Sequence, residues 1–167
     1  MTIYPTLTVW QPWATLIAIG AKPLEYRGWE LPTRLIGQRV AVHAGARPVK
    51  KDEVRELLLH LQSSFWRETG LLREPAIKLL TDVLMSPGAL PRSSIVCLAT
   101  MGKAIRNGEM ERRMGLPVIA DSDRTEHTNW GWPLLDIQPL EPPLPARGAQ
   151  GWWHWTAPDD IRLGRAA

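Results

Sequence analysis

The stretch W-Q-P-W-A-T-L-I-A-I-G-A-K-P-L-E-Y-R-G-W, which runs from Trp10 to Trp29, decides how this chain folds. It opens with two tryptophans around a proline, and an apolar run follows that Gly20 is placed to end. After this glycine come four polar or amphipathic side chains, those of Lys22, Glu25, Arg27 and Trp29. A core segment does not need so many charges, and a solvated loop does not need three tryptophans. The pattern predicts a helix that delivers charged and aromatic side chains to the rim of a pocket.

Residues 22–29 follow this helix in extended form. Leu24 and Tyr26 alternate there with Glu25 and Arg27, which predicts that the two charges lie on one face of a strand. Before the helix, Pro12 suits a first turn, where the missing N–H of proline costs little.

The other elements follow from hydrophobic spacing. We expect strands at 5–9, 39–44, 94–100, 131–140 and 152–155, and helices at 50–69 and 74–85. The continuous apolar run at 94–100 indicates a central strand, whereas the prolines in 131–140 suit an edge. Residues 101–128 are polar and poorly periodic, so we expect a helical turn and a mobile loop. Whether that loop is a lid over the pocket stays open.

Length and composition indicate one globular domain. The 167 residues, 44% of them hydrophobic, fit a single domain at 1–157, with a helical insertion at about 50–85 and a frayed tail at 158–167. Several short strands, one early helix and the lack of βαβ alternation predict a mixed α+β fold built on a small barrel. The net charge of +3 permits nucleic-acid binding without requiring it.

Cysteine and histidine usage limits the chemistry. Cys97 is the single cysteine and stands in an apolar run, which predicts a buried thiol, no disulfide framework and a reducing cytoplasm. No segment approaches the length of a membrane span, and no signal peptide opens the chain, so we expect a cytoplasmic protein that does not bind membranes. The four scattered histidines make a zinc site improbable, and no metal or other cofactor is expected.

The stretch from Trp10 to Trp29 resembles the signature of the ASCH domain, a branch of the PUA-like superfamily, in its bacterial form. The signature reads Q-P-W-A, an apolar helix, then G-x-K-x-x-E-x-R-x-W, and the chain matches it at Gln11, Pro12, Trp13, Ala14, Gly20, Lys22, Glu25, Arg27 and Trp29. The resemblance continues through His43-Ala44, the run 90–96 and Gly131-Trp132, and it covers most of the chain. It implies a PUA-like β-barrel, with the early helix beside a cleft and an RNA-related role.

The chemistry of these residues allows the same role. Lys22 and Arg27 suit phosphate, Gln11 and Glu25 suit the edges of bases, and aromatic faces stack on bases. The expected ligand-binding residues are Gln11, Trp13, Lys22, Glu25, Arg27, Trp29, His43 and Ser93. The expected partner is RNA, another single-stranded nucleic acid or a nucleotide.

Structural roles for the same residues stay open. Glu25 and Arg27 can equally form an internal ion pair, and at least one of Trp10 and Trp13 is expected in the core. A histidine at a strand end, such as His43, is more often hydrogen-bonded than catalytic. With nine tryptophans in the chain, some are still expected to line a surface or cleft.

Hydrolysis in the same cleft is the alternative function. The resemblance extends to small amidohydrolases acting on acylated cytidine, whose proposed nucleophile is a threonine three residues after the lysine; Glu25 stands there, which weakens this mechanism. Another branch is associated with cleavage of single-stranded RNA. Lys22 and Tyr26 are the candidate catalytic residues, supported by Arg27 and Ser93 or Ser94. A third interpretation, a protein-interaction adaptor, would use an exposed apolar patch on residues 50–85.

Overall fold

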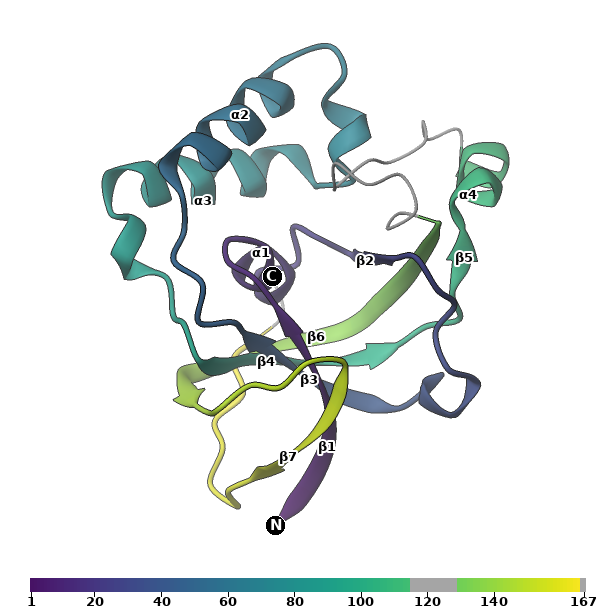
Figure 1. Cartoon of the computed structure of the whole chain (residues 1–167), viewed down its shortest axis with the longest axis vertical. Helices are drawn as coiled ribbons and strands as arrows, with labels where there is room; N and C mark the ends of the chain where they lie inside the picture. The colour runs from purple at the N-terminus through teal and green to yellow at the C-terminus, as the bar shows by residue number, and fades with distance from the viewer. Residues whose placement is uncertain (115–128, 166–167) are drawn as a thin grey trace.

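The computed structural model describes residues 1–114 and 129–165 and shows a curved sheet with two helices stacked above it (Figure 1). The strands are β1 (Thr2–Val9), β2 (Leu24–Arg27), β3 (Arg39–Ala44), β4 (Ser94–Met101), β5 (Ile105–Arg106), β6 (Trp130–Pro145) and β7 (Trp152–Ala157). The α-helices are α1 (Trp13–Ala18), α2 (Lys51–Gln62), α3 (Arg73–Met85) and α4 (Asn107–Met114). The mixed α+β prediction is confirmed.

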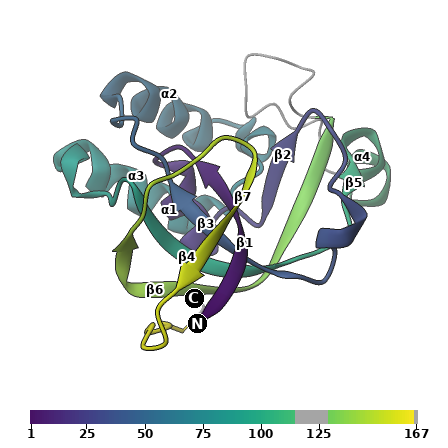
Figure 2. The ribbon, with the colours of Figure 1, turned by 60° about the horizontal axis from the view of Figure 1, so that its bottom comes forward.

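The seven strands form one sheet in the order β2-β6-β4-β3-β1-β7, and β5 pairs with β6 (Figures 1 and 2). β1 and β3 are parallel, and the other neighbours are antiparallel. β2 and β7 stand at the two ends of this order. Among the described strands, no pairing joins these ends, so the sheet does not close into the expected barrel.

The prediction that residues 131–140 form an edge strand is right only in part. β6 stands between β2 and β4 in the strand order, but it pairs with β2 over residues 130–133 and with β4 over residues 134–145. Pro142 and Pro143 fall where the register against β4 is broken: Pro139 lies opposite Cys97, and the next paired residues are Leu144 and Ile95. β6 therefore bulges over this interval, where a proline does not interrupt a regular ladder. The central position predicted for 94–100 is confirmed by β4.

α1 lies between the sheet and the α2–α3 pair (Figure 1). Its Ala14 and Ile17 pack into the core on the sheet, whereas Leu16 packs into the core of the helical pair. Trp13 is partly buried against both cores. Gly20 has the left-handed φ of +77° expected of a residue that ends a helix. α1 therefore fixes where the chain enters β2.

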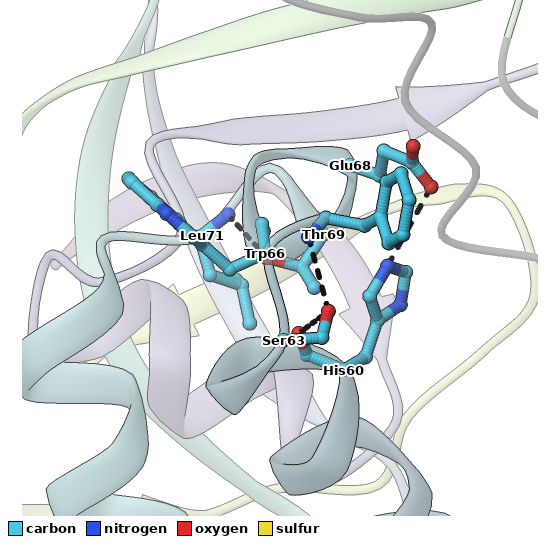
Figure 3. A network of polar contacts seen from close by, with 7 residues as sticks. His60, Ser63, Trp66, Glu68, Thr69 and Leu71 are labelled. Atoms are coloured by element: carbon cyan, nitrogen blue, oxygen red, sulfur yellow. Dashed lines mark hydrogen bonds and ion pairs between the residues drawn. The ribbon is translucent and has the colours of Figure 1, made fainter.

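The predicted helical pair is present, but its first helix ends at Gln62 and not at residue 69. The Ser63 hydroxyl donates to the His60 carbonyl and accepts from the Phe65 amide. These side-chain bonds replace the backbone bonds of a further helical turn, so the helix ends here. Figure 3 shows this turn, with His60 Nε2 lying 3.6 Å from Glu68 Oε2. A short 3₁₀ turn, Trp66–Thr69, then leads towards α3.

The helical pair exposes four large apolar side chains, those of Leu59, Phe65, Leu72 and Met85. Leu72 directly precedes α3, a 13-residue helix, and Met85 is its last residue. At a rise of about 1.5 Å per residue, they stand about 20 Å apart. The exposed residues are thus spread along the pair, and the adaptor interpretation stays a prediction.

The residues expected to fray at the C-terminus are attached to β6 as far as Gly164. The Gly164 amide donates to the Pro139 carbonyl at 2.8 Å, and the Glu141 amide donates to the Arg162 carbonyl at 3.1 Å. These bonds hold residues 162–164 against β6.

The structure bears on the predictions for Cys97 and for membrane-spanning segments. Cys97 is buried as expected, and burial raises the pKa of its thiol to about 12, although the nearby Arg39 charge opposes this. No helix among residues 1–114 and 129–165 has the length and apolar character needed to cross a membrane.

Candidate functional site

β2 brings three charged side chains of the signature together. Arg27 Nη2 lies 2.9 Å from Glu25 Oε1, which confirms that these two alternate residues share one face of the strand. Lys22 stands just before β2, with Nζ 3.7 Å from Glu25 Oε2. The Lys22 residue is 1% exposed and Glu25 is 6% exposed, so a carboxylate lies between two cations away from solvent.

Aromatic rings surround the buried lysine. Lys22 Nζ lies 4.7 Å from the centre of the Tyr26 ring and 5.3 Å from that of Trp13. Each ring presents a negative face to the ammonium, an interaction worth about 2 kcal/mol when it is desolvated. These contacts and the Glu25 carboxylate together offset the cost of removing the charge from water. Lys22, Glu25, Tyr26 and Trp13 are thus brought together as predicted.

Three tryptophans stand beside this charge cluster. Trp132 lies opposite Glu25 in the β2–β6 pairing, so both side chains are on one face, and Trp132 has no exposed surface. Its ring stacks on Trp152, with centroids 5.9 Å apart, and meets Trp29 edge-on at 6.1 Å. The Arg27 guanidinium carbon lies 6.0 Å from the Trp29 ring centre. We call Lys22, Glu25, Arg27, Trp29, Trp132 and Trp152 the ion–tryptophan site.

Three buried polar atoms in this site have unused hydrogen-bonding capacity. Within the described part of the chain, no hydrogen-bond partner reaches Glu25 Oε2, Arg27 Nε or Trp152 Nε1. The contact of Glu25 Oε2 with Lys22 is too long for a hydrogen bond. Folded proteins rarely leave such atoms unpaired, since each costs about 1–3 kcal/mol. One acceptor and two donors in the interior of the site are therefore left unpaired.

Gln11 is at the other end of α1 and has a structural role. Its Oε1 accepts the Thr15 amide at 3.1 Å, while Nε2 donates to the Thr15 hydroxyl at 2.8 Å and to the Pro91 carbonyl at 2.7 Å. It caps the first turn of α1 and ties it to the segment before β4. The six residues of α1, about 9 Å of helix, separate Gln11 from Lys22.

Ser93 and His43 belong to a second group of residues. Ser93 is exposed and has a φ of +48°, and its carbonyl accepts the Ala146 amide at 2.9 Å. The Ala146 carbonyl in turn lies 3.0 Å from His43 Nε2. The His43 ring contacts Trp153 edge-on. Because Trp152 and Trp153 are consecutive on β7, they point to opposite faces of the sheet, and the sheet separates His43 from the ion–tryptophan site.

The contacts of His43 indicate which of its two ring nitrogens carries the proton. A carbonyl only accepts, so Nε2–H donates to Ala146. The Thr8 hydroxyl lies 3.3 Å from Nδ1 and 2.9 Å from the Ala149 carbonyl, and its single proton serves one of them at a time. A neutral ring protonated on Nε2 fits this geometry. Gly148 packs directly against the His43 ring, where a larger residue does not fit: a Cβ at position 148 would lie 2.7 Å from Nδ1.

His43 makes stability depend on pH in a defined direction. Burial lowers the pKa of His43 below 6.5, and the hydrogen bond to the Ala146 carbonyl opposes this only in part. Between the two pKa values the unfolded chain binds more protons than the folded one, so stability rises with pH. We expect the free energy of unfolding to be highest above about pH 6.5 and to fall as the pH drops towards the lower folded-state pKa.

Urea titrations of the parent and of His43→Gln between pH 4.5 and 8 check this. The difference in unfolding free energy between the two should shrink as the pH falls below about 6.5. His154→Gln, which removes an exposed histidine of β7, is the matched control and should keep the parent's pH profile. A constant difference between parent and His43→Gln at every pH would contradict the assignment of a neutral buried ring.

Sequence reasoning did not single out Trp132 and Trp152 as site residues. The available signal was the count of nine tryptophans. It indicates that some of them line a surface or cleft, but it does not identify those residues. Their place depends on β6 lying beside β2, a pairing between residues more than 100 positions apart.

Within the described residues, no three His, Cys, Asp or Glu side chains gather as metal ligands. The loop predicted within residues 101–128 lies partly outside the described residues.

A separate hollow of about 670 Å³ opens beside β3, β4 and the middle of β6 and contains no residue of the ion–tryptophan site. It is lined by Arg39, Thr100, Asp136, Ile137, Gln138, Leu163, Gly164 and Arg165. Arg39 already donates to Thr100, the Asp136 carbonyl and Gln138. Its charge is therefore used within the chain, and the hollow is the weaker candidate for a binding site.

Comparison with protein-family models gives no match, and comparison with curated proteins gives no significant match.

Proposed function

We propose that the chain is an ASCH-type domain that binds nucleic acid, either single-stranded RNA or a nucleotide, in the ion–tryptophan site. The observation that carries this proposal is the set of buried, unpaired polar atoms beside an aromatic wall. Glu25 Oε2 can accept from a base edge, whereas Arg27 Nε and Trp152 Nε1 can donate to one. Trp29 is 53% exposed and offers a face for stacking.

The arrangement of the signature residues supports the proposed family. The two charged residues of β2, the lysine before it and Trp29 gather at one site, while Gln11 and Gly20 define the helix that leads there. We further propose that the curved sheet is an open form of the PUA-like barrel. Under this proposal Gln11, His43 and Ser93 act through the loops that they hold and not through direct ligand contact.

Removing the partly exposed cation of the site should weaken binding. We expect Arg27→Gln to lower affinity for a labelled single-stranded RNA 8-mer at least about tenfold, since a hydrogen bond to a charged group contributes about 1.5–3 kcal/mol. Each lost phosphate contact should also reduce the slope of log affinity against log salt by about 0.7. Fluorescence anisotropy at several salt concentrations measures both quantities.

Arg55→Gln is the control, because it removes the same charge from an exposed position on α2. Thermal melting of each variant separates lost binding from lost folding. Folded variants that bind like the parent with the parent's salt slope would refute the proposed function.

Hydrolysis in the same site is the second candidate function, favoured by the 4.7 Å approach of Lys22 Nζ to the Tyr26 ring. Glu25 occupies the threonine position of the amidohydrolases, and the Thr15 hydroxyl is bonded to Gln11 at the far end of α1. A mechanism here would therefore use Lys22 and Tyr26 and not a threonine. Incubation with RNAs and acylated nucleosides, with and without chelator, tests it; substrates left intact across the pH range would exclude it.

A further inference from the structure

Two arginines flank a tryptophan where three strands run side by side. Trp130 of β6 lies opposite Arg27 of β2 and also opposite Arg106 of β5. Directly opposed residues of antiparallel strands point to the same face, so the three side chains form a row. The Arg106 guanidinium carbon lies 5.3 Å from the centre of the Trp130 ring. Figure 2 shows β2, β6 and β5 next to one another. We call Arg27, Trp130 and Arg106 the Arg–Trp–Arg row.

The row lies at the mouth of the ion–tryptophan site. Arg27 and Trp130 are each two residues along their strands from Glu25 and Trp132, which puts them on the same face at a distance of about 7 Å. Exposure to solvent rises along the row: Glu25 is 6% exposed, the Arg27 side chain is 26% exposed, and Arg106 is exposed. The charged line thus runs from the interior to solvent.

The charge of the row is not neutralised at its outer end. Among the described residues, Arg106 forms no ion pair, and its guanidinium is held only against the indole of Trp130. Arg27 shares the Glu25 carboxylate with Lys22, so one carboxylate serves two cations. Two guanidinium forks on either side of a half-buried indole suit a phosphate group next to a stacked base.

We infer, on the basis of the proposed function, that the site binds its nucleotide as part of a single strand and not as a free nucleoside. The ion–tryptophan site holds one base, and the Arg–Trp–Arg row binds the neighbouring residue of the strand. Arg106 and Arg27 contact its phosphate, and its base stacks on Trp130. A duplex does not fit this arrangement because its bases already stack on one another.

Calorimetric and anisotropy titrations of the parent test this with three probes: the four ribonucleosides, their 5′-monophosphates and single-stranded 8-mers of each base. We expect an 8-mer to bind at least about tenfold more tightly than the matching nucleoside, because two phosphate contacts and one stacked base are added. Arg106→Gln should weaken 8-mer binding about tenfold more than it weakens nucleoside binding, and lower the 8-mer salt slope by about 0.7.

Arg106→Lys, which keeps the charge but loses the planar fork, should restore the salt slope and only part of the affinity. Arg55→Gln is again the control. A nucleoside that binds as tightly as the 8-mer, or Arg106→Gln with the parent's 8-mer affinity, would overturn the inference while leaving the proposed function standing. A parent that binds none of the probes would overturn both.

Discussion

Replacing Glu25 by alanine should lower the free energy of unfolding by about 3–5 kcal/mol, the cost of removing one partner from a buried ion pair. Glu25 is the carboxylate that both Lys22 and Arg27 contact, and Lys22 is almost fully buried. Without Glu25 the two cations repel each other across a region of low polarity. Urea or guanidinium unfolding followed by circular dichroism gives the difference.

Glu53 provides a matched control for this prediction. It also contacts two cations, Arg47 and Lys50, but 45% of its side chain is exposed. Solvent screens such a pair, so Glu53→Ala should cost less than about 1 kcal/mol. The double variant Lys22→Met/Glu25→Ala should recover part of the loss because it removes one of the two cations. Equal costs for Glu25→Ala and Glu53→Ala would contradict the burial of the charge cluster.

Trp132→Ala should also lower the free energy of unfolding by about 3–5 kcal/mol, as expected for the loss of a buried aromatic side chain. Trp132 has no exposed surface, contacts both Trp29 and Trp152, and donates its Nε1–H to the Trp29 carbonyl at 3.2 Å. The substitution removes the packing that joins β2 to β7 and leaves that carbonyl without its donor. Chemical unfolding measures the loss.

Trp10→Ala is the control for the loss of an indole as such. Trp10 is 56% exposed and contacts the Arg47 guanidinium at 4.6 Å. An exposed contact of this kind contributes about 1 kcal/mol or less. If Trp10→Ala and Trp132→Ala destabilised the protein equally, the stacked tryptophans would not be the structural centre described above.

Local patterns gave the right answer where neighbouring residues decide the structure. The alternation in residues 24–27 predicted that Glu25 and Arg27 share a face, and the apolar run R-V-A-V-H-A predicted β3 with its observed bounds. Gly20 predicted the end of α1 because glycine readily adopts the left-handed φ that commonly follows the last turn of a helix, and Gly20 has this φ. Each of these conclusions depends on contacts within a few residues.

Contacts between distant segments were beyond such patterns. Trp132 reaches Glu25 only because β6 pairs with β2, and the prolines of β6 suggested an edge strand although Pro133 lies opposite Leu24 in that pairing. Gln11 matched the family signature, and His43 belongs to the resemblance beyond it, but α1 and the sheet separate them from Lys22. Sequence spacing alone does not say on which face of a curved sheet a residue ends up.

The most direct test of the central claim is a crystal structure of the protein with a bound single-stranded RNA 8-mer. The ion–tryptophan site should hold one base against Trp29, with hydrogen bonds to Glu25 Oε2 and Arg27 Nε, and a phosphate of the strand should lie between Arg27 and Arg106. A strand bound in the hollow between Arg39 and Arg165, with the ion–tryptophan site unchanged and empty, would contradict the claim.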